Sequence, residues 1–505
     1  MAESKPDVSK VELPSKKGVI RSIEVGETSQ GCDQLVISVD QEAKMQSGLG
    51  REERFKMFEE EENEVRVSKT PKIQKVIFLL RDHKDFVKYY EPRVVSLGPI
   101  HHGKEKYHLA ERFKRNLAKK FVKSSGKTIK DLFNEIENNI KELRECFEEE
   151  ATKKYNDVDL AWILVVDGCA ILQYIYVADK KKFKELNIKQ DSVAFCQQDL
   201  FLLENQVPYR LLELLMSSSG QYGNELRYSV KEFIRRNHEM VLRDKQQGEN
   251  TNGPAPANPQ QENGKRTPTA HLLDLLRSSL LGLESGSENA TKNGEIREAK
   301  NNVSDWQSYR NVQELKAAGI HVKRSKAKSL GGISFSRRLN FYPGFLWLPP
   351  LIVDDSTGPK LLNLIAYEMC LDFENDFGIT SYVSFLDSLI DEANDVKELR
   401  KAHVLFNLLG SDEEVAKLFN EIGTDLVPDL DKYTNVKTQI QEYYEKTWVP
   451  WVAEFFHNHF SSPWTLLAFL GALFALALSA TQTWYAVDSP SGPCDKFCDK
   501  FNKNL

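Results

Sequence analysis

The residues of this 505-residue chain best suited to chemistry are two adjacent histidines, His101 and His102, in the stretch "VSLGPIHHGK". Neighbouring side chains diverge by about 100° on a helix and about 180° on a strand, so both rings cannot easily bind one metal ion. His108 would share a helical face with His101, but Pro99 and Gly103 argue against a continuous helix between them. The histidines are therefore predicted to be turn residues that bond to nearby carbonyls and carboxylates.

A catalytic role for either histidine would need a carboxylate partner. The sequence offers Asp167, Glu204 and Asp354, each next to an apolar segment. An enzyme built on these groups requires them to converge in one pocket with a histidine, within direct or one-water reach. Asp354 is followed directly by Asp355, and adjacent carboxylates on a strand point to opposite faces, which favours a turn at a strand end.

Known catalytic and phosphate-binding spacings are incomplete in this chain. "SSGKT" resembles the end of a P-loop, but Phe121 stands where the leading glycine belongs. "HEMVL" begins like a zinc-binding HExxH helix, but Leu242 replaces the second histidine. The chain contains neither GxSxG nor GxGxxG. We expect no catalytic residues, no cofactor-binding residues and no enzyme activity.

Composition narrows the functional classes further. A net charge of -6 does not point to nucleic acid as a partner. Seven scattered cysteines suit a mostly reduced core better than a disulfide framework. Cys494 and Cys498 form a CxxxC, but no second pair completes a zinc site. We expect no metal ligands.

Two successive helices of opposite charge are predicted after the histidines. Residues 101–125 carry eight Lys or Arg against two Glu, and residues 131–150 carry two against eight Asp or Glu. Steps of four predict an apolar side on the first helix made of Leu109, Phe113, Leu117 and Phe121. The basic helix could bind phosphate, but the short loop between the two helices favours an antiparallel pair that neutralises its own charge.

An almost wholly apolar segment follows, from Leu160 to Ala178. Its length would allow a membrane span, but Asp167 near its middle would cost about 2.5–3.5 kcal/mol in lipid. A buried bundle helix is therefore predicted. The next helical pattern breaks at Val207–Pro208, because proline disfavours the helical conformation of its predecessor.

The sequence predicts a mainly α (α+β) fold, a large helical domain with a small β-containing segment around 314–355. Turns are expected at Gly331–Gly332 and Pro343–Gly344. The predicted organisation is a flexible charged arm (1–68), a first helical part (69–245), a polar, largely disordered insert (246–304) with a short helix at 271–283, a second part of strands and then helices (305–460), an apolar helix (463–487) and a tail (488–505).

The C-terminal apolar helix is predicted to cross a membrane once. No charged residue occurs from Ser462 to Val487, and this length exceeds the roughly 30 Å of bilayer hydrocarbon. Trp464 stands at one edge, with Trp484 and Tyr485 at the other, as interfacial anchors do. We expect a single-pass protein of the plasma membrane or an endomembrane, with the lipid bilayer as a partner of this helix.

The side of the membrane that holds the body stays open. The N-terminus lacks the apolar core of a secretory signal, which favours a cytosolic body. The tail carries Lys496, Lys500 and Lys503, which by the positive-inside rule favours a cytosolic tail instead.

Several blocks of the chain resemble the plant family known as domain of unknown function 247, or uncharacterised protein family 0481. They include "VSLGPIHHG", "DGCAILQ", "DLFLLENQVPYRLLELL", "ELKAAGIHVK", "LPPLIVDDSTGPKLLNLIAYEMC" and "LGSDEEVAKLFN", together with the segment leading into and through the apolar helix. The resemblance covers about Ile73 to Val487. One departure is Ile77, where the family usually has proline.

The resemblance implies a mostly helical plant protein with one span near its C-terminus and no established enzyme activity. Some grass members are implicated as pollen determinants of self-incompatibility. We therefore favour a membrane-anchored interaction or cell-recognition protein with an unknown protein partner, no nucleic acid and no small-molecule substrate. The alternatives are an enzyme with a histidine–carboxylate site and a membrane-tethered signalling or regulatory protein.

Overall fold

A computed structural model describes residues 71–82, 84–183, 190–242, 268–283, 311–338, 341–373, 376–444 and 463–487, all within the unit Ser68–Leu505. The predicted arm at 1–68, most of the predicted insert at 246–304 and the tail at 488–505 lie outside the described residues.

Helices make up most of the described chain, as predicted. Those of the first half are α3 (Phe78–Arg81), α4 (Phe86–Tyr90), the 3-10 helix η2 (Glu105–Tyr107), α5 (His108–Ser125), α6 (Ile129–Asn138), α7 (Ile140–Glu145), α8 (Glu149–Thr152), α9 (Asp157–Asp179), α10 (Gln190–Asp199), the 3-10 helix η4 (Leu203–Asn205), α11 (Tyr209–Ser218), α12 (Gly220–Val241) and α13 (Leu272–Leu281).

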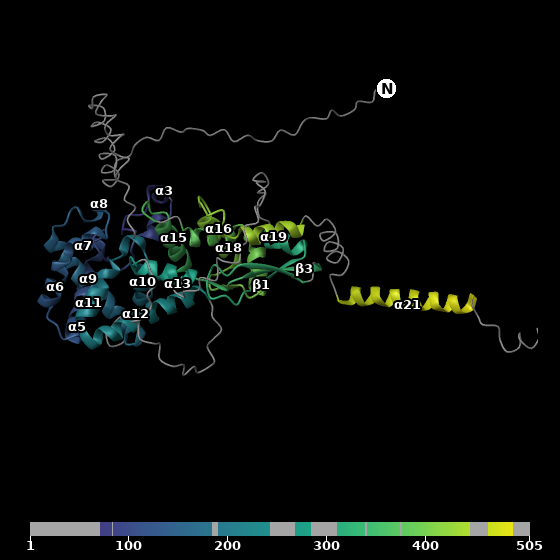
Figure 1. Cartoon of the computed structure of the whole chain (residues 1–505), viewed down its shortest axis with the longest axis horizontal. Coiled ribbons are helices and arrows are strands. Elements are labelled where there is room, and N and C mark those ends of the chain that lie inside the picture. The colour runs from purple at the N-terminus through teal and green to yellow at the C-terminus, as the bar shows by residue number, and fades with distance from the viewer. Residues whose placement is uncertain are drawn as a thin grey trace, which may run out of the picture. The chain divides into compact units, whose positions relative to one another are not determined.

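The apolar helix α9 is the centre of the first half. Helices α5, α6, α7, α11 and α12 pack against it (Figure 1). Asn156 caps its first turn by accepting a hydrogen bond from the backbone N–H of Asp159. Because α9 is apolar on all sides, it needs neighbours on all sides, and 89% of its most apolar stretch is buried. The prediction of a bundle helix rather than a span is confirmed.

Helix α5 departs from the predicted apolar side at its first position. The side chains it turns inward are Ala110, Lys114, Leu117, Ala118 and Phe121. Leu109 is 87% exposed, because steps of four residues drift by about 40° around a helix and carry the first position off the buried face. The predicted apolar side therefore holds for Leu117 and Phe121, which are buried, and for Phe113, which packs partly buried against the core.

The basic and acidic helices do not neutralise each other. Both α5 and α6 pack on α9 rather than pairing along their lengths. Acidic α7 instead pairs elsewhere, with Glu142 Oε1 3.1 Å from Nε of Arg210 on α11. The predicted antiparallel pair is wrong, because the apolar surface of α9 outcompetes the charges as a packing partner.

The β-containing segment consists of β1 (Ile320–Arg324), β2 (Ser334–Arg338), β3 (Phe341–Leu348) and β4 (Leu351–Val353). Strand β3 is central in the order β1-β3-β2, parallel to β1 and antiparallel to β2. The predicted turn at Pro343–Gly344 is wrong, because both residues lie inside β3. The register to β1 starts only at Gly344, and the register to β2 shifts at Arg337–Arg338, so the proline sits where the ladder is irregular.

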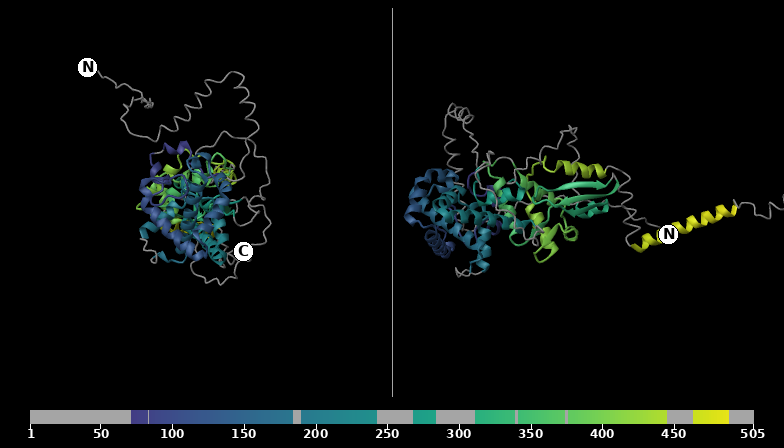
Figure 2. Two further views of the ribbon diagram at one scale, coloured as in Figure 1. Left: turned by 90° about the vertical axis from the view of Figure 1, so that its left-hand side faces the viewer. Right: turned by 60° about the horizontal axis from the view of Figure 1, so that its bottom comes forward.

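The remaining described elements are α14 (Val312–Ala317), α15 (Thr357–Glu368), α16 (Gly378–Asp387), α17 (Ala393–Lys401), β5 (Leu405–Asn407), α18 (Asp412–Ile422), α19 (Thr434–Tyr444) and α21 (Pro463–Val487). Strand β5 pairs in parallel with β4. Helix α19 lies beside β2 of the three-stranded sheet, as the right-hand view of Figure 2 shows.

Contacts between segments far apart in sequence hold the two halves of the body together. The backbone N–H of Lys72 donates to Asp372 Oδ2 (2.7 Å), and the amide of Gln74 donates to Asp372 Oδ1 (2.6 Å). The predicted short helix at 271–283 is confirmed as α13, which is held by the buried ion pair of Arg277 Nε with Glu368 Oε1 (2.7 Å). One hydrophobic core runs through both halves.

Candidate functional site: a buried polar junction

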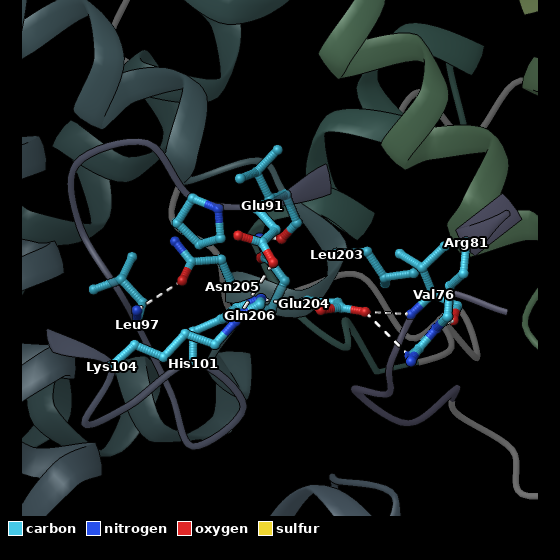
Figure 3. Close-up of polar contacts among 12 residues, drawn as sticks. Val76, Arg81, Glu91, Leu97, His101, Lys104, Leu203, Glu204, Asn205 and Gln206 are labelled. Atoms are coloured by element: carbon cyan, nitrogen blue, oxygen red, sulfur yellow. Dashed lines mark hydrogen bonds and ion pairs between the residues drawn. The ribbon is translucent and has the colours of Figure 1, made fainter. Parts of the chain in front are cut away.

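A buried polar junction joins two segments, the loop Arg93–His102 and the connector Asp199–Gln206. At its centre His101 Nε2 lies 3.0 Å from Glu204 Oε2 (Figure 3), with 3% and 6% of the two side chains exposed. Of the three carboxylates considered, Glu204 is thus the one that meets His101, in an enclosed contact. The histidine comes from the loop that precedes α5, and the carboxylate comes from η4.

Glu204 also binds the segment that opens the described chain. Its Oε1 accepts from the backbone N–H of Val76 at 2.8 Å and lies 3.4 Å from Arg81 Nη2. Burial alone would raise the pKa of Glu204, but His101, the Val76 amide and Arg81 together outweigh burial and lower it. Glu204 is therefore held as a carboxylate by three groups from two segments.

The other members of the connector bind the loop through its backbone. Asp199 accepts from the backbone N–H groups of Arg93, Val94 and Val95 at 2.8–2.9 Å. Asn205 Oδ1 accepts from the Leu97 N–H at 2.7 Å. These bonds satisfy loop amides that would otherwise be buried without partners.

Gly98 lies where the loop comes closest to the connector. Its φ is +65°, and a Cβ on it would stand 2.6 Å from the carbonyl oxygen of Gln206. Its N–H donates to Asp167 Oδ2 of α9 at 2.9 Å. A glycine is therefore required both by its left-handed backbone and by close approach.

Asp167 forms an ion pair inside the bundle rather than a site with the histidines. Its Oδ1 lies 2.6 Å from Lys114 Nζ, which also contacts Glu111 Oε1 (2.7 Å) and the Ser96 carbonyl (2.7 Å). Burial would lower the pKa of Lys114, but the two carboxylates raise it. This ion pair explains how a charged residue can lie in the apolar middle of α9.

The second histidine is placed differently from the first. His102 Nδ1 is 4.0 Å from Glu111 Oε1, and its ring meets the edge of Tyr155. The Tyr155 hydroxyl donates to the carbonyls of Pro99 (3.2 Å) and His102 (3.4 Å). His102 thus belongs to the packing of the loop end, as expected of a turn residue.

Asp354, the third carboxylate considered, lies directly after β4 and caps the start of α15. Its Oδ1 accepts from the Ser356 N–H (2.9 Å) and the Ser356 hydroxyl (2.7 Å). Lys360 Nζ donates to the same hydroxyl at 2.9 Å, and burial lowers the pKa of this lysine. The predicted strand-end turn is confirmed, and Asp354 has no contact with either histidine.

The junction holds two segments together, and its central pair is enclosed. Neither His101 nor Glu204 is open to solvent. A proton relay would need a second group on Nδ1 of His101, and within the described part of the chain no residue hydrogen-bonds to that atom. In the described ranges no three His, Cys, Asp or Glu side chains gather as metal ligands would.

Sequence reasoning missed Asp199, Asn205 and Gln206 of the connector, and it missed Lys114 of α5, which pairs with Asp167. One signal for Lys114 was present, since it lies four residues after Ala110 and three before Leu117 on the buried face of α5. A lone cation on such a face indicates a buried carboxylate, here Asp167. The connector polar residues carry no comparable pattern.

The chain matches the family model DUF247, described as plant protein of unknown function, over residues 73–478. The chain belongs to this family. The match begins at the residue that pairs with Phe147 and extends into α21, so it includes the whole junction.

Two relatives from Arabidopsis thaliana support the family assignment. The chain is 27% identical to the UPF0481 protein At3g47200 over 434 residues, covering 79% of this chain and 83% of the relative. It is 23% identical to the putative UPF0481 protein At3g02645 over 477 residues, covering 79% and 87%. No solved structure matches the chain.

Proposed function

We propose that this plant protein is anchored in a membrane by α21 and acts by presenting its helical body to a protein partner. The observation that carries the proposal is α21 itself. It is a 25-residue helix without a charged residue, and none of the stretch Leu467–Val487 is buried in the body.

Exposure of α21 to water would be costly. Leu467, Phe469, Leu470, Leu473, Phe474, Leu476 and Leu478 are each at least 45% exposed. Burying apolar surface contributes about 25 cal/mol per Å². Because α21 exposes so many apolar side chains, it requires an apolar environment. A bilayer supplies one, and Trp464, Trp484 and Tyr485, which stand at the two ends of the helix, suit its interfaces.

The body supports interaction rather than catalysis. Its most chemically capable pair, His101 and Glu204, is enclosed and bonded to the chain itself. Large apolar side chains do reach the surface on the first two short helices, where Phe78, Leu79 and Val87 are 63–69% exposed. Such side chains are typical of a protein-binding surface.

Recognition between cells, including the pollen self-incompatibility implied by the family resemblance, is one form that this function could take. A membrane-tethered regulatory role is a second form with the same anchor and surface. The two differ in the side of the membrane that holds the body, because cell recognition needs the body outside the cytosol.

Carbonate extraction and protease protection test the anchor and the side together. Microsomes carrying the chain with a tag at each end should keep it through carbonate washing. Protease should then remove one tag and spare the other until detergent is added. Release of the chain by carbonate would contradict anchoring by α21.

Affinity capture tests the surface. The full chain, taken from membranes in mild detergent after crosslinking, should retain a specific protein that a Phe78→Glu/Val87→Glu variant loses. Leu371→Glu is the matched control, because Leu371 is 95% exposed but lies elsewhere in the chain. Equal capture by all three chains would contradict recognition through α3 and α4.

A further inference from the structure

The outer face of α5 is a stripe of unpaired basic side chains. Arg112, Arg115, Lys119 and Lys123 are exposed, and within the described ranges none of them forms an ion pair. At about 100° per residue the four lie within about 80° of arc, directly opposite the buried face of the helix. From Arg112 to Lys123 the stripe is about 16 Å long.

The charge of this stripe is not cancelled by the rest of α5 or by the acidic helices. Glu111 and Asp167 both form ion pairs with the buried cation, Lys114. Helices α6 and α7 pack on α9, and acidic Glu142 of α7 pairs with Arg210. The four exposed cations therefore project a local positive field from a chain whose net charge is -6.

We propose that this face of α5 binds the anionic headgroups of a phospholipid bilayer. The proposal rests on the proposed function, in that α21 would hold the body beside a bilayer and so raise the local concentration of headgroups. Basic side chains near such a surface gain about 1 kcal/mol each from its negative potential, and a straight helical stripe can lay all four against a plane.

The composition of the face favours lipid over nucleic acid. No Phe, Tyr or Trp lies on this face between Arg112 and Lys123 to stack on bases. The apolar side chain beside them is Leu109, which is 87% exposed and could enter the headgroup layer as the apolar residues of interfacial helices do.

Flotation with two sets of membranes tests the proposal. The full chain is first inserted through α21 into nanodiscs of neutral phosphatidylcholine. These nanodiscs are then mixed with vesicles of phosphatidylcholine, with or without phosphatidylserine. Capture should require phosphatidylserine and should weaken with added salt, because the interaction is screened beyond a Debye length of about 10 Å at 0.1 M.

The decisive variant reverses three cations, Arg112→Glu, Lys119→Glu and Lys123→Glu. Its affinity for the anionic vesicles should fall by at least about 100-fold. The matched control, Lys75→Glu, Lys231→Glu and Lys397→Glu, makes the same change in net charge at exposed lysines elsewhere. The control should bind as the unaltered chain does, and all three chains should share one melting temperature.

Three results would overturn the proposal. They are equal capture by neutral vesicles, full capture of the α5 variant, or tighter binding of single-stranded RNA that the α5 variant alone loses. A chain that does not enter nanodiscs contradicts anchoring by α21 instead. The same flotation is then run on the free chain, so that the lipid contact of α5 is still decided.

Discussion

Helices α9 and α21 are alike in sequence and opposite in surroundings. Both are long and apolar enough to cross a membrane, yet 89% of the relevant stretch of α9 is buried and none of that of α21 is. The apolar middle of α9 includes a charged residue, Asp167, which the helix can carry because Lys114 and Gly98 bind it. Hydropathy alone therefore does not separate the two helices, and the burial of α9 depends on partners that satisfy its buried charge.

The largest expected effect comes from placing one lysine in each of the two helices. Leu172→Lys puts an unpaired cation at a fully buried position of α9 and should cost more than about 4 kcal/mol, enough to unfold a marginally stable body. Leu473→Lys in α21 should leave the melting temperature of the body unchanged and weaken membrane insertion by about 2.5–3.5 kcal/mol. Circular dichroism in detergent and carbonate extraction measure the two effects. If Leu473→Lys melts the body, α21 belongs to its core.

The next largest effect is expected from the ion pair between Lys114 and Asp167. Asp167→Ala leaves Lys114 buried with Glu111 as its one remaining carboxylate, and should reduce the free energy of unfolding by about 3–5 kcal/mol. The double change Lys114→Met/Asp167→Leu replaces both charges by apolar groups of similar volume and should recover most of that loss. Denaturant titration measures both. A double variant as unstable as the single one would mean that the charges are needed for more than each other.

Gly98 ties the loop to Asp167, and a methyl group there should cost about 1–3 kcal/mol. Gly98→Ala combines an unfavourable positive φ with a clash against the Gln206 carbonyl. Gly103→Ala is the matched control, since Gly103 also has a positive φ, +86°, but open space around it. The difference between the two melting temperatures isolates the clash. Equal losses would show that the loop can move away from the connector.

The smallest expected effect is the dependence of the body on pH. The pKa of Glu204 is lowered in the fold, so its stabilisation is present above its ordinary value of 4.5 and is lost as pH falls through the folded pKa. Glu204→Gln should therefore lose less stability than the unaltered chain between pH 6 and pH 3. Insertion of α21, which has no carboxylate, should not change over this interval. A parallel loss in both chains would remove Glu204 as a cause.

The sequence allowed α9 to be assigned to the core, because Asp167 is a local signal, and it located α21 as a helix apolar enough to span a membrane. It did not reveal that His101 meets Glu204, since the two residues lie far apart in the sequence and are brought together only by the tertiary fold. Strand β5 was missed because three residues carry no period, and it exists through its pairing with β4. The prediction that the two charged helices neutralise each other was wrong because it did not consider the apolar surface of α9 as a competing packing partner.

The pairing of Lys72 and Gln74 with Asp372 also fixes a delay during synthesis. The two sides of this contact are 300 residues apart. At about 5–20 residues per second, the first must wait roughly 15–60 s for the second to be made. The N-terminal segment of the body therefore lacks its partner Asp372 for most of translation. A chaperone that binds the nascent chain would protect this segment for the longest time.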